Sequence, residues 1–157
     1  IDKNTADAGG KGLIQNGKAN LITGELDKRL PETIQVIRTL EIEKNRRYML
    51  TFTAKTDKSG PVTITYGLRK YPYTSCASSI VRLNKGEKRY ECILDVGDID
   101  KKYSAKPRAL RIRAGLIKNA SISISKISLV EVVPVTLAIT APVPSTTSNV
   151  SGAVNTI

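Results

Sequence analysis

Two segments far apart in the chain alternate apolar and polar residues with the period of a β-strand. Residues 48–55 read YMLTFTAK, and residues 121–132 read SISISKISLVEV, where the apolar face slips by one residue at Lys126. Successive side chains of a strand point to opposite faces, so each segment presents one apolar face to a core. The pair predicts two strands of one β-sandwich. The residues expected to point inward are Tyr48, Leu50, Phe52, Ile124, Ile127 and Leu129.

Shorter strand candidates occupy much of the remaining chain. They cover residues 13–15, 33–43, 62–68, 80–83, 89–96 and 110–114, with turns rich in Gly, Pro and Asn between them. The turn Asn84-Lys85-Gly86-Glu87 predicts a hairpin between the strands that flank it. No stretch has helical periodicity of useful length. The pattern therefore predicts an all-β fold, an antiparallel β-sandwich.

Composition divides the chain into three parts. Residues 1–12 are polar and glycine-rich, which predicts a flexible lead-in, and residues 13–132 carry the pattern of one sandwich module. Residues 133–157 carry no charged side chain, which predicts an extended C-terminal arm, either a linker or the start of a following β domain. Because an exposed, uncharged, β-prone arm favours aggregation, we expect it to pair with a following domain or a neighbouring chain.

Two features of the chain limit its location and its partners. It begins at Ile1 without a signal-like segment, which indicates a processed piece, and no apolar run approaches the roughly 20 residues of a spanning helix. The formal net charge of +11 predicts attraction to polyanions such as acidic polysaccharide, nucleic acid, teichoic acid or anionic lipid. A solvated, lysine-rich surface is the alternative interpretation of the same charge.

The residue composition excludes several kinds of reactive site. The chain has no histidine, which removes Ser–His and Cys–His nucleophile pairs and His-ligated zinc. Cys76 and Cys92 are too few for a structural zinc site. They flank the expected hairpin, and they either form a disulfide or remain buried free thiols. No metal or cofactor is expected.

Four short motifs resemble carbohydrate-binding modules of the family 4, 9, 16 and 22 group. Residues 48–60, YMLTFTAKTDKSG, resemble a conserved strand of these modules, and residues 12–17, GLIQNG, are similar to their opening strand. Residues 85–90, KGEKRY, resemble a central hairpin, and residues 124–131, ISKISLVE, resemble the closing strand. The resemblance implies a jelly-roll β-sandwich attached to a secreted glycan-active or cell-surface protein.

The chain departs from this family at positions that concern ligands. The family binds sugar rings with exposed aromatic side chains, above all Trp, and this chain has no Trp. A stacking platform would have to come from Tyr71 and Tyr73. Asn20 and Ser125 replace the acids that the resemblance would lead us to expect around a structural calcium, so no calcium is expected.

A basic strand is the first candidate for binding. Residues 101–130 contain no acidic residue, and Arg111 and Arg113 project from the same side of one strand. If that strand neighbours the one that bears Thr53 and Lys55, the outer face becomes a cationic sheet rich in hydroxyl groups. Guanidinium groups hold carboxylates or sulfates, and threonine hydroxyls bond sugar hydroxyls. The alternative is that the arginines only solvate the sheet.

The second candidate is a loop that interleaves basic and aromatic side chains. It contains Arg69, Lys70, Tyr71 and Tyr73. Such a loop stacks on a sugar or base while it neutralises an anion, and it serves equally well as a contact with another protein.

No catalytic site emerges from the sequence. Asp95, Asp98 and Asp100 lie close together, but their spacing lacks the glycine and the distal glutamate of an EF-hand loop. A solvated turn at a strand end is the better interpretation, and we expect no enzyme activity.

Two functions remain as hypotheses. The first is a non-catalytic module that binds acidic or cell-wall polysaccharide and anchors a larger protein outside the cell or at its surface. The alternative is a structural assembly subunit, of a virion, surface layer or appendage, in which the arm contacts neighbouring subunits. Nucleic acid is the less favoured partner, because no recognition motif accompanies the charge.

Overall fold

The computed structural model describes residues 11–24 and 34–134, so the lead-in up to residue 10 and the arm from residue 135 lie outside the described residues. None of the described segments forms a helix able to cross a membrane. The elements of this part are β1 (Lys11–Gln15), β2 (Lys18–Ile22), β3 (Gln35–Thr39), β4 (Arg46–Thr56), β5 (Gly60–Leu68), β6 (Ser75–Leu83), β7 (Gly86–Val96), a 3₁₀ helix (Lys101–Tyr103), β8 (Arg108–Arg113) and β9 (Ser121–Glu131).

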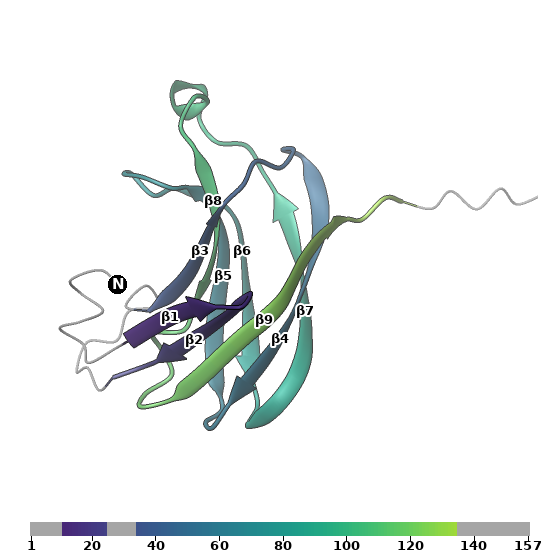
Figure 1. The fold of residues 1–157 in the computed structure, drawn as a ribbon. Coiled ribbons are helices and arrows are strands. Elements are labelled where there is room, and N and C mark those ends of the chain that lie inside the picture. Colours follow the sequence, from purple (N-terminus) through teal and green to yellow (C-terminus); the bar gives the residue numbers. More distant parts are fainter. Residues whose placement is uncertain (1–10, 25–33, 135–157) are drawn as a thin grey trace, which may run out of the picture.

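The strands form two sheets that pack face to face (Figure 1). The first, sheet A, has the strand order β1-β2-β9-β4-β7, and the second, sheet B, has the order β3-β8-β5-β6. Every pair of neighbouring strands is antiparallel. The predicted all-β antiparallel sandwich is confirmed.

The core between the sheets is built from the apolar faces that the sequence indicated. Leu50 and Phe52 of β4 are fully buried, and so is Tyr66 of β5. Ile124 of β9 is buried as well. The other two residues of β9 that were expected to point inward, Ile127 and Leu129, are only partly buried against the core.

The slip at Lys126 is a β-bulge. Phe52 of β4 is opposed by two residues of β9, Lys126 and Ile127, and Lys126 adopts a φ of 52°. The extra residue returns Ile127 to the inner face of the sheet. The predicted change of face is therefore confirmed.

The predicted hairpin at residues 84–87 is wrong. β6 pairs with β5 in sheet B, whereas β7 pairs with β4 in sheet A, so the chain crosses between the sheets at this turn. The hydroxyl of Tyr90 accepts a hydrogen bond from the Asn84 amide at 2.8 Å and approaches the Asn84 carbonyl at 3.4 Å. It thereby occupies the backbone groups with which a hairpin would begin.

The predicted strand at residues 33–43 is shortened to β3. Beyond Thr39 the chain leaves sheet B and crosses toward β4. The buried hydroxyl of Tyr66 directs this crossing, because it donates to the Leu40 carbonyl at 3.3 Å and accepts from the Ile42 amide at 3.1 Å.

Strand β2 was not predicted. It follows the expected turn at Asn16 and Gly17, whose φ angles of 51° and 70° are those of a tight hairpin turn. Its five residues alternate between exposed and buried, and Ala19 and Leu21 extend the core.

Candidate functional site

The outer surface of sheet B carries a set of polar side chains centred on β8. Residues that pair directly in an antiparallel sheet share a face. Arg111 pairs with Ile37 of β3 and Thr65 of β5, and Arg113 lies one step along the same side of β8. We call this surface the sheet B face. It comprises Gln35, Ile37, Thr63, Thr65, Ser78, Ile80, Arg111 and Arg113.

Arg111 is buried although it lies on this outer surface. Only 2% of the residue is exposed, and its Nη2 atom donates a hydrogen bond to the Leu68 carbonyl. Its Nη1 atom is buried and has no hydrogen-bond partner. Within residues 11–24 and 34–134, no carboxylate forms an ion pair with Arg111 or Arg113. Arg111 is therefore a buried cation to which no described residue supplies a counter-charge.

Other unpaired polar atoms gather around Arg111. Buried polar groups in proteins are normally hydrogen-bonded, so each exception indicates a missing partner. The described residues contain five buried side-chain nitrogen or oxygen atoms that have no hydrogen-bond partner. Of these, only Ser123 Oγ lies on sheet A. The other four all belong to the sheet B face: Gln35 Oε1, Thr65 Oγ1, Arg111 Nη1 and Arg113 Nε.

The electrostatic surroundings favour an anion beside Arg111. Burial is the main cause that lowers the pKa of Arg111, and the neighbouring charges of Arg113 and Arg69 lower it further, while Tyr73 raises it. A guanidinium remains charged at neutral pH despite such shifts. A bound carboxylate or sulfate would relieve both the burial cost and the repulsion.

The loop between β5 and β6 borders one end of the sheet B face. This tyrosine loop, residues 69–74, projects beyond sheet B on the side away from β4 and β7 (Figure 1). Tyr71 and Tyr73 are 78% and 56% exposed. Their ring centroids lie 6.5 Å apart with the rings at 88°, so the loop presents two faces of different orientation.

Hydrogen bonds hold this loop to the neighbouring segments. Arg69 Nη1 donates to Thr39 Oγ1 at 2.6 Å, and Lys106 Nζ donates to the Tyr71 carbonyl at 3.1 Å. The Leu68 amide donates to the Thr74 carbonyl at 2.8 Å. The side chain of Lys70 is exposed. Arg69, Lys70, Tyr71 and Tyr73 thus lie at the same end of sheet B as Arg111.

The expectation that Arg111 and Arg113 share one outer face with Thr53 and Lys55 is wrong. β8 lies between β3 and β5 in sheet B, whereas β4 lies in sheet A. Thr53 and Lys55 pair with Ser125 and Ser123 of β9 and face outward from the opposite side of the sandwich. Alternation fixes which side of a strand a residue occupies, but it does not fix the sheet to which that strand belongs.

Gln35 and Thr65 are site residues that the sequence did not indicate. Thr65 belongs to the polar side of a predicted strand, which gave it no distinction from other threonines. Gln35 lies in a candidate strand whose alternation was imperfect. Their relevance depends on pairing with β8, a contact between segments far apart in the chain.

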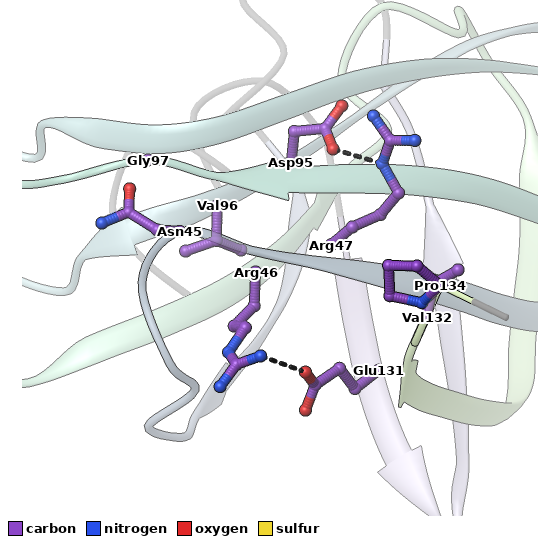
Figure 2. A pocket seen from close by; sticks show the side chains of 9 residues that line it. All are labelled: Asn45, Arg46, Arg47, Asp95, Val96, Gly97, Glu131, Val132 and Pro134. Atoms are coloured by element: carbon purple, nitrogen blue, oxygen red, sulfur yellow. Dashed lines mark hydrogen bonds and ion pairs between the residues drawn. The ribbon is translucent and has the colours of Figure 1, made fainter. Parts of the chain in front are cut away.

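A hollow lies where β4 begins and where β7 and β9 end (Figure 2). Its volume is about 600 Å³, and its charged side chains neutralise one another. Arg46 Nη1 lies 3.3 Å from Glu131 Oε1, and Arg47 Nε lies 2.6 Å from Asp95 Oδ1. The hydrogen bond and charge of Asp95 raise the pKa of Arg47. No aromatic residue is among those that line this hollow, so it suits a glycan less well than the sheet B face with its bordering tyrosine loop does. The lining residues are Asn45, Arg46, Arg47, Asp95, Val96, Gly97, Glu131, Val132 and Pro134.

The three clustered aspartates bond to different cations. Asp95 pairs with Arg47, Asp98 with Lys44 at 3.0 Å, and Asp100 with Lys102 at 3.2 Å. Asp100 also accepts from the Lys102 amide at the start of the 3₁₀ helix, and this bond is the main cause of its lowered pKa. In the described part of the chain, no three acidic or cysteine side chains gather as metal ligands.

Cys76 and Cys92 are free thiols on strands of different sheets. Both are partly buried, and burial is the main cause that raises the pKa of each. A hydrogen bond with Ser79 lowers the pKa of Cys92 to a lesser degree.

These thiols are expected to react slowly in the folded protein. Because the thiolate is the nucleophile, a raised pKa leaves less of it at neutral pH, and alkylation should accelerate as the pH rises. Mass spectrometry after iodoacetamide treatment should find the native chain largely unmodified and the unfolded chain doubly alkylated without prior reduction. A mass lower by two hydrogens before reduction would instead establish a disulfide.

Comparison with solved structures relates the fold of this chain to known β-sandwiches. No protein-family model and no curated protein matches it. A solved CBM4 structure matches with a TM-score of 0.63 at 15% identity, over 79% of each chain. Two cellulose-binding domains of β-1,4-glucanase C from Cellulomonas fimi also match. The second N-terminal domain has a TM-score of 0.61 at 16% identity, over 79% of this chain and 82% of that one. The N-terminal domain has a TM-score of 0.56 at 12% identity, over 79% and 84%. At these identities the likeness shows the fold, which is the β-sandwich of carbohydrate-binding modules.

Proposed function

We propose that this chain is a non-catalytic module that binds acidic or cell-wall polysaccharide and anchors a larger extracellular protein. The sheet B face and the tyrosine loop form the binding surface. One observation carries the proposal, namely the four buried polar atoms without partners on one face of one sheet. The fold supports it, because the matching structures are a CBM4 module and cellulose-binding domains.

The two arginines suit an anionic group on the sugar. Arg111 and Arg113 lie two apart on the same side of β8, about 7 Å along the strand, so one anionic substituent can reach both guanidinium groups once their buried N–H groups turn outward. A uronate carboxylate or a sulfate accepts hydrogen bonds from both guanidinium groups, and charge-assisted bonds are stronger than neutral ones. Thr65 Oγ1 and Gln35 Oε1 then bond neighbouring sugar hydroxyls.

The sheet B face also lacks the groups of a glycosidase. Glycoside hydrolysis normally requires two carboxylates on either side of the scissile bond. The outward positions of β3, β8, β5 and β6 that form this face carry no carboxylate. The face therefore supports binding without cleavage.

Calorimetric titration at two salt concentrations tests this function. Polygalacturonate is a suitable acidic ligand, and a neutral β-glucan is its control. We expect binding of the acidic polymer at low salt and weaker binding at high salt, because the contact depends on charge. Absence of binding to every acidic polysaccharide at low salt would refute the proposal.

Tyr73→Ala is expected to weaken polysaccharide binding by about tenfold, because an exposed aromatic ring contributes roughly 1–2 kcal/mol when it stacks on a ligand. Tyr73→Phe is the matched control, since it keeps the ring and removes only the hydroxyl. The same calorimetric titration measures both variants. Equal affinities of the alanine variant and the unchanged chain would remove Tyr73 from the site.

A second candidate function, the structural assembly subunit, is favoured by a different observation. Strand β2 pairs with β9 only as far as Ile124, so the rest of β9 up to Glu131 offers, on that side, a backbone edge to which no described strand pairs.

A further inference from the structure

Among the described strands, none pairs with β9 along half of its length on the side of β2. Strand β2 pairs only with residues 121–124 of β9, whereas β9 continues to Glu131. In Figure 1 the β1–β2 hairpin ends partway along β9 and leaves the rest of that side uncovered. Within the part of the chain that the structure describes, no strand pairs with this side of β9 beyond Ile124. We call this open side, residues 126–131, the β9 slot.

The β9 slot presents backbone groups that are ready for pairing. The Val132 amide donates to the Arg47 carbonyl of β4 at 2.8 Å. Because successive residues of an antiparallel strand direct their N–H and C=O groups to alternate sides, Leu129 and Glu131 direct theirs away from β4. These groups point into the slot. An exposed strand edge of this kind is a template for another strand.

The slot also leaves part of the core uncovered. Ile127 and Leu129 point inward from β9 but are only partly buried. Leu40 and Ile42, where the chain leaves sheet B, are partly buried against the same core. On the outer side, Val130 is 60% exposed. A strand added beside β9 with apolar residues on its inner side would complete this burial.

We propose that the β9 slot accepts residues 135–140 of a second copy of this chain as an added strand. These residues read VTLAIT, so Val135, Leu137 and Ile139 alternate with Thr136, Ala138 and Thr140. The alternation matches sheet A, whose inner side is apolar and whose outer side along β9 carries serines. The segment has no charge, so its insertion carries no cost of desolvating an ion.

The two residues that precede this segment favour its pairing with β9 of a second copy over pairing with β9 of the same chain. A direct return along β9 needs a tight turn at Val133 and Pro134. Two-residue hairpin turns require a positive φ, which proline does not adopt and which β-branched valine strongly disfavours. A direct return of residues 135–140 along their own β9 is therefore disfavoured, and we assign the segment to the β9 slot of a neighbouring copy.

Two variants of the full chain separate the donor from the acceptor. Leu137→Lys places a charge on the apolar side of the donor segment. Glu131→Pro removes a backbone N–H that faces the slot and leaves the β4 bonds intact, and Glu131→Ala is its matched control. Size-exclusion chromatography with light scattering measures the mass of each protein across a wide concentration range.

We expect the unchanged chain and Glu131→Ala to assemble as concentration rises, and each blocked variant alone to remain monomeric. An equimolar mixture of Leu137→Lys and Glu131→Pro should form a one-to-one pair and nothing larger, because one partner supplies the segment and the other the slot. A monomeric unchanged chain, assembly that survives in both variants, or a mixture that stays unpaired would each overturn the proposal.

A peptide measurement decides the matter if Glu131→Pro does not fold. A fluorescent peptide of residues 134–141 should bind the full-length Leu137→Lys chain, as measured by anisotropy. The same peptide with Leu137→Lys should bind about tenfold more weakly or worse, because it loses the burial of one large apolar side chain. Equal binding of the two peptides, or binding of neither, contradicts the proposal.

Discussion

Replacing Arg111 by methionine is expected to abolish most of the affinity for acidic polysaccharide while the fold becomes no less stable. Methionine fills a similar volume and removes a buried charge that has no counter-ion in the described structure. Replacement of buried charges by apolar side chains often leaves stability unchanged or raises it by about 1–4 kcal/mol. The affinity should fall about a hundredfold, because a ligand anion loses a buried charged partner.

Lys55→Met is the matched control for this prediction. It removes the same charge from the opposite face of the sandwich, where Lys55 is exposed on sheet A. Thermal unfolding and calorimetric titration should separate the two variants, with a loss of affinity for Arg111→Met alone. Equal losses would mean that the net charge attracts the polymer without a defined site. A large loss of stability in Arg111→Met would show that the bond to the Leu68 carbonyl is structurally essential.

Gly67→Ala is expected to disturb both the fold and the binding surface. Gly67 lies on β5 where the tyrosine loop returns, and a Cβ there would stand 2.2 Å from the Thr74 carbonyl oxygen and 2.6 Å from Ser75 Cα. Both are backbone atoms, so the loop would have to move. We expect a loss of about 3 kcal/mol in the free energy of unfolding, measured by urea denaturation, because overpacking against backbone is seldom relieved. Polysaccharide affinity should fall as Tyr73 is displaced.

Gly12→Ala provides the comparison at a site with room to adjust. Its added Cβ would meet the end of the Leu21 side chain at 3.3 Å, which can shift by a rotation. We expect a much smaller change in stability and no change in affinity. Similar stabilities of the two alanine variants would show that the loop does not pack on Gly67.

The sequence predicted which residues are inward far better than which strands are neighbours. Alternation is a local property, so the burial of Leu50, Phe52 and Ile124 could be inferred from a few adjacent residues. The sheet to which a strand belongs depends on contacts between distant segments. The turn at residues 84–87 illustrates this, because the strands on either side of it belong to different sheets, and the hydroxyl of Tyr90 bonds to the backbone at the crossing.

The candidate site could be inferred only in part for the same reason. The basic strand and the tyrosine loop were evident from residue types alone. Alternation also placed Arg111 on an outer face, where an arginine is normally solvated. Its burial arises from the neighbouring strands and loop, which no local pattern specifies. Gln35 and Thr65 acquire their significance only through the pairing of β3 and β5 with β8.

The position of β9 has a consequence for the order in which the fold forms. β9 is the last described strand in the chain, yet it lies between β2 and β4 in the middle of sheet A. Before residues 121–131 have been synthesised, the hairpin of β1 and β2 has no strand that joins it to the rest of its sheet. Pairings between such distant segments fold slowly. A growing chain therefore exposes the unpaired backbone edges of β2 and β4 until this late strand inserts between them.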